Sequence, residues 1–177
     1  MATSEAAKTT SKPEIFQGRF RSAVTLALNS KFPEISVLKP KQEEALFGFL
    51  QRKDVFAVLP TGCGKSLIFQ LVPDVCSLLQ LQGLDYPKNA ILIVICPLNA
   101  LVDSHINELC ERGISACSLT EGNFSEDDLK AGKYSIVLTN PESLVLNNKW
   151  RTLLKSEVYQ QNLFGLVADE AHVVPKW

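Results

Sequence analysis

One segment decides the fold of this 177-residue chain, Asp54-Val55-Phe56-Ala57-Val58-Leu59-Pro60-Thr61-Gly62-Cys63-Gly64-Lys65-Ser66. Its apolar first half predicts a strand over residues 55–59, and its second half predicts a tight loop that ends in Gly-Lys-Ser. In a phosphate-binding loop, glycines let successive N–H groups face one anion, the lysine reaches the β- and γ-phosphates, and the serine hydroxyl binds Mg²⁺. A helix after the loop would point its positive end at the same phosphates. The full pattern has a glycine where Leu59 stands, so on its own the motif also fits an accidental turn.

Composition and charge are ordinary for a globular chain, with 46% apolar and 21% charged residues and a net charge of −1. Residues 1–41 carry seven Lys or Arg against three Glu, which fits either contact with a polyanion or a solvated helix face. Residues 1–12 are small and polar, so we expect a disordered tail and no secretion signal. Five cysteines without a Cys-x-x-Cys pair predict free thiols in a reducing compartment.

Apolar segments of about six residues alternate with helical patterns, which predicts an α/β fold. The expected strands after the loop cover residues 90–95, 114–119, 134–139 and 164–168. The expected longer helices cover residues 15–29, 40–51, 64–79, 98–112, 141–146 and 150–159. We expect Pro73 to bend or end the third of these and Gly113 to end the fourth. A short acidic helix capped by Ser125 is also expected. Because the strands are apolar throughout, we expect a mostly parallel sheet with helices on both faces.

Asp169 and Glu170 directly follow the last expected strand, at the sheet edge where α/β proteins bind ligands. Nucleotide hydrolysis needs an Asp at such a place to hold Mg²⁺ and an adjacent acid to activate water. Two carboxylates at a strand end could also be a solvated loop face. Together with the loop that ends at Ser66, they predict machinery for nucleotide hydrolysis.

These residues also carry a family resemblance. Asp169-Glu170-Ala171-His172 resembles motif II of superfamily 2 helicases in its DEAH form, and residues 59–66 resemble motif I, where the first glycine is commonly replaced. Residues 38–42, 96–103 and 139–142 resemble motifs 0, Ia and Ib of RecQ-type DNA helicases, with Lys39 in place of the usual Arg. The resemblance covers residues 38–177. It implies a first RecA-like helicase lobe over that range, preceded by a helical segment over residues 13–37.

The resemblance implies roles for individual residues. Gln42 would recognise adenine, although it could also be an ordinary exposed helix residue. Lys65, Asp169 and Glu170 would form the catalytic set, with Asp169 and Ser66 on Mg²⁺. The phosphates of ATP would be cradled by Thr61, Gly62, Cys63, Gly64, Lys65 and Ser66. Nucleic acid would be contacted by Pro97, Asn99, Thr139, Glu142 and, by base stacking, Trp177; plain turn chemistry is the alternative for the first four. His172 would couple ATP to nucleic acid, whereas His105 in mid-helix is expected to be structural.

The implied activity is Mg²⁺-dependent ATP hydrolysis coupled to 3′-to-5′ movement along single-stranded or forked DNA, with no membrane partner. The implied location is the nucleus, with the cytoplasm as an alternative inside the cell. The resemblance also implies a second RecA-like lobe, which this sequence lacks. We therefore expect a truncated first lobe that is incomplete at its C-terminus, with an unfilled strand position in its sheet, exposed strand edges and no unwinding activity alone. A lobe of a DEAH-type or DEAD-type RNA helicase and a non-catalytic nucleotide-binding module remain alternatives.

Overall fold

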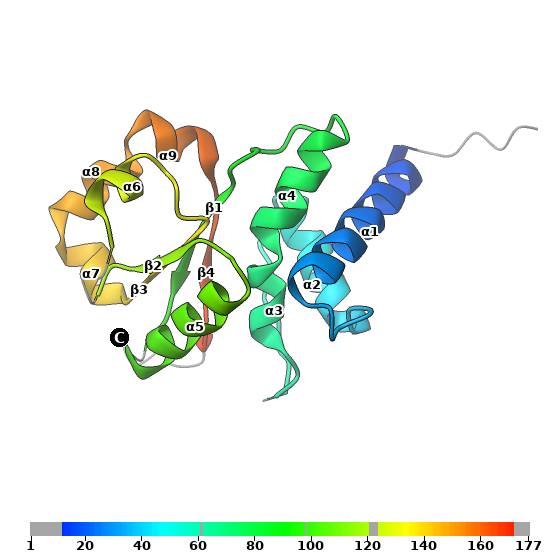
Figure 1. The fold of residues 1–177 in the computed structure, drawn as a ribbon, viewed down its shortest axis with the longest axis horizontal. Coiled ribbons are helices and arrows are strands. Elements are labelled where there is room, and N and C mark those ends of the chain that lie inside the picture. The colour runs from blue at the N-terminus through cyan, green and yellow to red at the C-terminus, as the bar shows by residue number, and fades with distance from the viewer. Residues whose placement is uncertain (1–11, 61, 98, 121–123, 172–177) are drawn as a thin grey trace, which may run out of the picture.

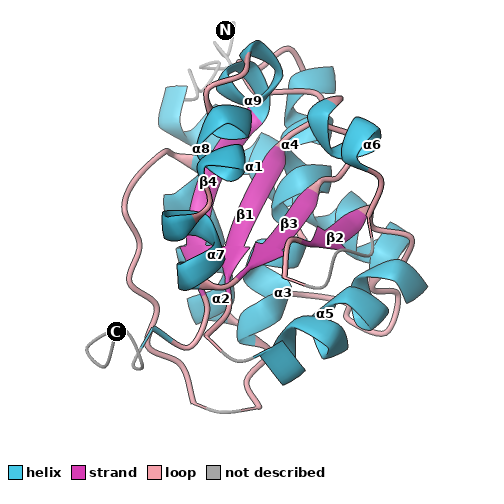
Figure 2. Cartoon of the chain, turned by 90° about the vertical axis from the view of Figure 1, so that its left-hand side faces the viewer, coloured by secondary structure: helices cyan, strands magenta, loops and turns pink. Residues whose placement is uncertain are grey.

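The computed structural model describes residues 12–60, 62–97, 99–120 and 124–171. Its sheet consists of β1 (Ile91–Ile95), β2 (Ala116–Ser118), β3 (Ile136–Thr139) and β4 (Leu163–Ala168). The strands lie in the order β2-β3-β1-β4 and all pairs are parallel. Figure 2 shows this sheet between two groups of helices. The expected α/β class and the RecA-like arrangement are confirmed.

Helices precede β1 and lie between each pair of successive strands along the chain (Figure 1). They are α1 (Lys12–Lys31), α2 (Pro40–Leu50), α3 (Lys65–Gln70), α4 (Val72–Leu81), α5 (Asn99–Glu111), α6 (Glu126–Lys130), α7 (Pro141–Leu146), α8 (Asn148–Leu154) and α9 (Glu157–Asn162). Pro73 separates α3 from α4 as predicted, because a proline inside the first turn of a helix gives up no hydrogen bond. The helix expected over residues 150–159 is wrong in detail, since Ser156 divides it into α8 and α9. None of the described helices has the length and apolar character that crossing a bilayer requires.

Alternate side chains of β1 pack into two cores on opposite faces of the sheet. Leu92 and Val94 join a core formed with α1 to α5. Ile91 and Ile93 join a second core formed with α6, α8 and α9. This two-sided burial explains why the strand is apolar throughout. Helix α1 packs against α4 in the first core, so the N-terminal helical segment contributes to the same hydrophobic core as the lobe.

The strand predicted over residues 55–59 is wrong. Residues 53–60 form no strand, and the side chains of Phe56 and Val58 are 83% and 80% exposed. A strand needs a neighbour to accept its backbone hydrogen bonds, and β4 at the edge of the sheet does not pair with this segment. Instead, residues 53–59 and the end of β4 line one cavity of about 500 Å³. The expected exposed edge is therefore present at β4, where Leu166 is 49% exposed.

Candidate nucleotide-binding site

The loop before α3 turns on two glycines. Gly62 and Gly64 have φ angles of 75° and 73°, in the left-handed region that favours glycine. A Cβ atom on Gly62 would meet open space, whereas one on Gly64 would lie 2.9 Å from Nε2 of Gln42. Any side chain at Gly62 would be strained by its φ angle, and at Gly64 it would also collide. Thr61, which is predicted to contact phosphate, lies outside the described residues.

Gln42 holds this loop against helix α2. Its side chain is buried, with the residue only 4% exposed. Nε2 donates hydrogen bonds to the carbonyl oxygens of Cys63 and Gly64, both at 2.9 Å, and Oε1 accepts one from the Lys39 amide at 2.8 Å. Gln42 is therefore not an ordinary exposed helix residue. Together with Cys63 and Ser66 it lines a cavity of about 360 Å³.

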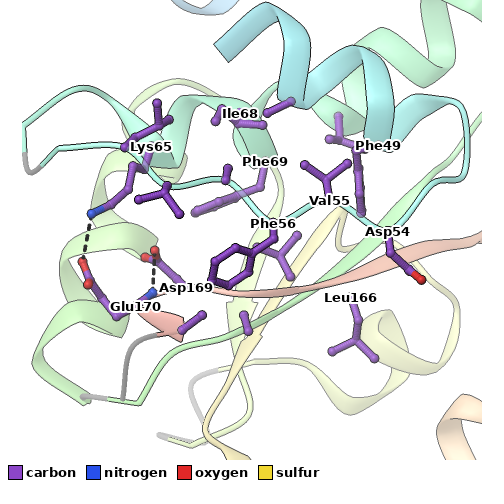
Figure 3. A pocket seen from close by; sticks show the side chains of 18 of the residues that line it. Phe49, Asp54, Val55, Phe56, Lys65, Ile68, Phe69, Leu166, Asp169 and Glu170 are labelled. Atoms are coloured by element: carbon purple, nitrogen blue, oxygen red, sulfur yellow. Dashed lines mark hydrogen bonds and ion pairs between the residues drawn. The ribbon is translucent and has the colours of Figure 1, made fainter. Parts of the chain in front are cut away.

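Lys65 connects the loop to the end of β4. Its Nζ atom lies 3.6 Å from Oε1 of Glu170, and both side chains are about 70% buried. Figure 3 shows the pair at the rim of the cavity of about 500 Å³ that Lys65, Asp169 and Glu170 line together. Glu170 has a φ angle of 51°, which few residues other than glycine adopt. The structure therefore brings the expected catalytic lysine and glutamate together from positions 105 residues apart in sequence.

Asp169 is fixed by three hydrogen bonds. Its amide donates to the carbonyl oxygen of Ile95 at 2.9 Å, which continues the β1–β4 ladder by one residue. Its Oδ1 atom accepts from the Glu170 amide at 2.9 Å, and its Oδ2 atom lies 3.2 Å from Nε2 of His105. The hydrogen bond from His105, supported by that from the Glu170 amide, holds the pKa of the Asp169 carboxyl below its ordinary value despite partial burial. The carboxylate is therefore ionised and oriented.

His105 was missed as a site residue. Its imidazole packs edge-on against the Phe69 ring, with centroids 5.7 Å apart, and reaches Asp169 from α5. Fully buried Cys96 also lies beside this pair, and burial together with the Asp169 charge raises the pKa of its thiol to about 12. The sequence does place His105 on the first helix after β1. That helix starts at the sheet edge where Asp169 also lies, so the position could have indicated a site residue.

The two residues expected to share Mg²⁺ line different cavities. Ser66 lines the smaller cavity with Gln42, and Asp169 lines the larger one with Lys65. The carboxylate and hydroxyl oxygens are suitable ligands for Mg²⁺. That Ser66 and Asp169 bind the same Mg²⁺ ion therefore stays a prediction.

The residues expected to contact nucleic acid lie where neighbouring strands end. The Cys96 amide donates to the carbonyl oxygen of Thr139 at 2.8 Å, which brings the segment with Pro97 beside the segment with Glu142. Pro97 is half-buried and Glu142 is exposed in the first turn of α7. Asn99 begins α5. Trp177 and His172 lie outside the described residues.

Thr139 does not fit its expected role. Its residue is fully buried, and its hydroxyl donates to the Asn140 carbonyl oxygen at 3.2 Å. A side chain enclosed in this way cannot touch a nucleic-acid backbone in this conformation. Thr139 therefore supports the turn into α7, and a contact with nucleic acid would fall to its exposed neighbours.

Comparisons with known proteins agree with this geometry. Residues 39–177 match the model of the family described as DEAD/DEAH box helicase. The chain is 28% identical over 152 residues to "ATP-dependent DNA helicase Q1" of Rattus norvegicus, covering 81% of this chain and 22% of that protein. It is 30% identical over 145 residues to "ATP-dependent helicase SGS1" of Saccharomyces cerevisiae (78% and 10%) and 30% identical over 143 residues to "ATP-dependent DNA helicase RecQ" of Synechocystis (77% and 27%).

The chain thus spans between 10% and 27% of the length of these relatives. The family match covers the described parts of the Gly-Lys-Ser loop, Gln42, Asp169 and Glu170. The site and the similarity therefore lead to the same conclusion, that this chain belongs to the DEAD/DEAH box helicase family.

Proposed function

We propose that this chain is the ATP-binding lobe of a RecQ-like DNA helicase and that Lys65, Asp169 and Glu170 carry its ATP chemistry. The observation that carries the proposal is the 3.6 Å approach of Lys65 Nζ to Glu170 Oε1 at the cavity between the loop and β4. A cation and a carboxylate from the two halves of the predicted machinery meet there. Such a pair can separate when an anionic phosphate takes the place of the carboxylate beside the lysine.

The loop residues fit a nucleotide. Gly62 and Gly64 hold the loop backbone in a left-handed conformation, and among the described residues beyond its chain neighbours none comes within 4 Å of a Cβ position on Gly62. Successive amides in such a turn form an anion-binding nest. Gln42 lines the adjoining cavity, and its amide would contact the base by exchanging one of its hydrogen bonds to the loop. Bound Mg-ATP would supply the phosphoanhydride bond that hydrolysis breaks.

Asp169 and Glu170 would have different roles in the reaction. Asp169 is held ionised, so its carboxylate and the Ser66 hydroxyl would hold Mg²⁺. Glu170 would orient the attacking water and accept its proton. Lys65 would neutralise negative charge on the phosphates, and Thr61 and Cys63 would contribute loop amides.

The substrate assignment rests on the relatives. Two of those named above, Q1 and RecQ, are called DNA helicases, which supports DNA, single-stranded or forked, as the partner. Pro97, Asn99 and Glu142 would lie along the strand, and Trp177 would stack on a base. We further propose 3′-to-5′ polarity, a nuclear location, and dependence on a second RecA-like lobe, since transition-state charge in this reaction is commonly offset by an arginine from outside the loop.

Nucleotide binding by Lys65→Ala tests the proposal. We expect a fluorescent ATP analogue with Mg²⁺ to bind wild type and to lose about tenfold or more in affinity in the variant, because a hydrogen bond to a charged group contributes about 1.5–3 kcal/mol. The control is Lys41→Ala, an exposed lysine on α2 that pairs with Glu44. Equal binding by wild type and Lys65→Ala would contradict the assignment.

The nucleic-acid assignment needs a separate readout. Filter binding with single-stranded DNA and RNA of the same sequence should show a preference for DNA, and Glu142→Lys should change that binding without altering ATP affinity. A preference for RNA would instead support the RNA-helicase alternative. Strand separation by the 177-residue chain alone would contradict its dependence on a second lobe.

A further inference from the structure

Three side chains of types that bind Zn²⁺ converge beside the candidate site. The ligand atoms of Cys96, His105 and Asp169 all lie within 4.8 Å of one another, a grouping found among the described residues. Cys96 follows β1, Asp169 follows β4, and His105 faces both from α5. Cys96 packs in the hydrophobic core beside the sheet and His105 hydrogen-bonds to Asp169, but neither contact explains why a thiol and an imidazole meet at one carboxylate.

The cluster is held by the backbone on two sides. The Cys96 amide donates to the Thr139 carbonyl oxygen at 2.8 Å, and the Asp169 amide donates to the Ile95 carbonyl oxygen at 2.9 Å. These bonds extend the β1–β3 and β1–β4 pairings past the strand ends. The two strand-end ligands therefore start from fixed main-chain positions, which reduces the cost of ordering them around an ion.

The spacing is close to that of a tetrahedral ion. His105 Nε2 and Asp169 Oδ2 are 3.2 Å apart. Two ligands bound to one tetrahedral Zn²⁺ at about 2.0–2.1 Å lie about 3.3 Å apart. The ion can take the place of the hydrogen bond between these atoms with little movement, and the Cys96 thiol needs to approach by about 1 Å at most to reach a zinc–sulfur geometry.

We propose that Cys96, His105 and Asp169 form a site for one Zn²⁺ or a similar divalent transition-metal ion. The ion would be held by the sulfur, one imidazole nitrogen and one carboxylate oxygen, which leaves a fourth position for water. Mg²⁺ prefers oxygen ligands and would not recruit the sulfur and nitrogen. Asp169 lines the cavity of about 500 Å³, which gives an ion a route to the cluster. Binding displaces the thiol proton to solvent, so one proton leaves as the sulfur–metal bond forms.

Occupancy of this site has a consequence that rests on the proposed function. The same Asp169 carboxylate is proposed to hold Mg²⁺ with ATP. A Zn²⁺ ion bound through Asp169, His105 and Cys96 would withdraw that carboxylate, so nucleotide affinity should fall as the ion binds. Metal binding itself requires no nucleotide and can be measured first.

Co²⁺ titration of the reduced, metal-free 177-residue chain tests the site, because cobalt is coloured in sites that bind zinc. We expect one equivalent of Co²⁺ to give the ultraviolet charge-transfer absorption of a thiolate–cobalt bond, and one equivalent of Zn²⁺ to remove it. Cys96→Ser should abolish this absorption. His105→Gln, which can still hydrogen-bond to Asp169, should weaken Co²⁺ binding by about tenfold or more, at least the loss seen for outer-shell partners of metal ligands.

The matched control is Cys110→Ser, which removes an exposed thiol from the same helix as His105. It should leave both stoichiometry and affinity unchanged, and circular dichroism should show that each variant is folded. Absence of the absorption in wild type, its persistence in Cys96→Ser, or its loss in Cys110→Ser would each overturn the site. If the metal binds but Lys65→Ala leaves nucleotide binding unchanged, the metal site stands and only the proposed ATP function fails.

Discussion

Gln42 donates a hydrogen bond from its side-chain amide to the carbonyl oxygen of Gly64 at 2.9 Å. The same nitrogen donates to Cys63, and the amide oxygen accepts from the main chain at the start of α2. One buried side chain thus links a helix start to the phosphate-binding loop. The loop conformation depends on a residue more than twenty positions earlier in the sequence.

Replacing Gln42 with Ala should destabilise the fold and weaken nucleotide binding together. The change leaves the Cys63 and Gly64 carbonyl oxygens without this donor in a largely buried place, which typically costs about 1–3 kcal/mol in the free energy of unfolding. We expect that loss in urea unfolding followed by circular dichroism, and a lower affinity for an ATP analogue.

Gln42→Glu tests whether the lost hydrogen-bond donor, and not the lost side-chain volume, causes this damage. It keeps the acceptor oxygen for Lys39 but replaces the donor with a carboxylate facing two carbonyl oxygens, so it should be as damaging as Gln42→Ala. Lys41→Ala on the same helix is the control, since its side chain is exposed. If Gln42→Ala has the same urea midpoint of unfolding as wild type, the hydrogen bonds from Gln42 to the loop do not contribute to stability.

Gly165 in β4 is needed because the Phe49 ring lies over it. A Cβ atom on Gly165 would lie 2.6 Å from Cζ of Phe49, closer than van der Waals contact allows. Gly165→Ala should therefore cost about 1–3 kcal/mol in stability, which is typical of overpacking and exceeds the gain of about 0.5–1 kcal/mol that Ala has over Gly in regular structure. Thermal and urea unfolding would measure the difference.

A double-mutant cycle identifies the cause. With Phe49→Leu the ring is gone, so Gly165→Ala should cost less than in wild type, with a coupling of about 0.5–3 kcal/mol between the two changes. Gly18→Ala is the matched control, since its Cβ would meet open space in the exposed face of α1, and it should be neutral or stabilising. If the effects of Phe49→Leu and Gly165→Ala on stability are additive, the Phe49 ring is not the cause of the stability loss in Gly165→Ala.

The sequence predicted local structure well wherever local signals act. Pro40 begins α2, Gly113 with a φ angle of 65° ends the helix before β2, and the Ser125 hydroxyl accepts from the Asp128 amide at the start of α6. Each feature depends on chemistry within a few residues. The continuous apolar strands likewise predicted a parallel sheet with two covered faces.

Apart from the division of one expected helix at Ser156, the failures involve contacts between distant residues. Residues 55–59 have the composition of a strand, but a ladder requires a neighbour, and β4 does not provide one. His105 appeared structural because its partner Asp169 is 64 positions away, and Thr139 appeared available because burial depends on packing that its own motif does not reveal. Sequence spacing indicates which residues could act, whereas the tertiary fold decides which of them meet.

Asp74 should make stability depend on pH. It lies in the first turn of α4, and its Oδ2 atom is buried with no hydrogen-bond partner in the part of the chain that the structure describes. Burial raises the pKa of its carboxyl above the usual value near 3.8, against a smaller opposing effect of Lys31. The folded state therefore binds this proton more tightly than the unfolded state, so this group lowers stability as pH rises from the unfolded pKa through the folded pKa.

Asp74→Asn removes that titration. The variant should gain stability over wild type at about pH 7, by under about 1 kcal/mol because the side chain keeps partial contact with water. The gain should shrink as pH falls through the folded pKa and then below 3.8, where the carboxyl becomes protonated in both states. Urea unfolding across this range measures it, with exposed Asp85→Asn as control. A gain that is constant with pH would assign the effect to packing instead of ionisation.

The exposed apolar segment opposite β4 should promote self-association. Val58 is 80% exposed and Phe56 is 83% exposed. Within the described ranges β4 has a strand partner on one side only, and its Leu166 is half exposed. Unpaired strand edges next to exposed apolar residues are templates for pairing with another chain, and a lysine there opposes it. Val58→Lys should therefore reduce self-association in sedimentation velocity while changing the free energy of unfolding by less than about 0.5 kcal/mol, as is usual for exposed positions.

Asn29→Lys is the control, since it adds the same charge on the exposed face of α1 and should leave association unchanged. If both variants reduce association equally, net charge is the cause, whereas an effect confined to Val58→Lys assigns it to this edge.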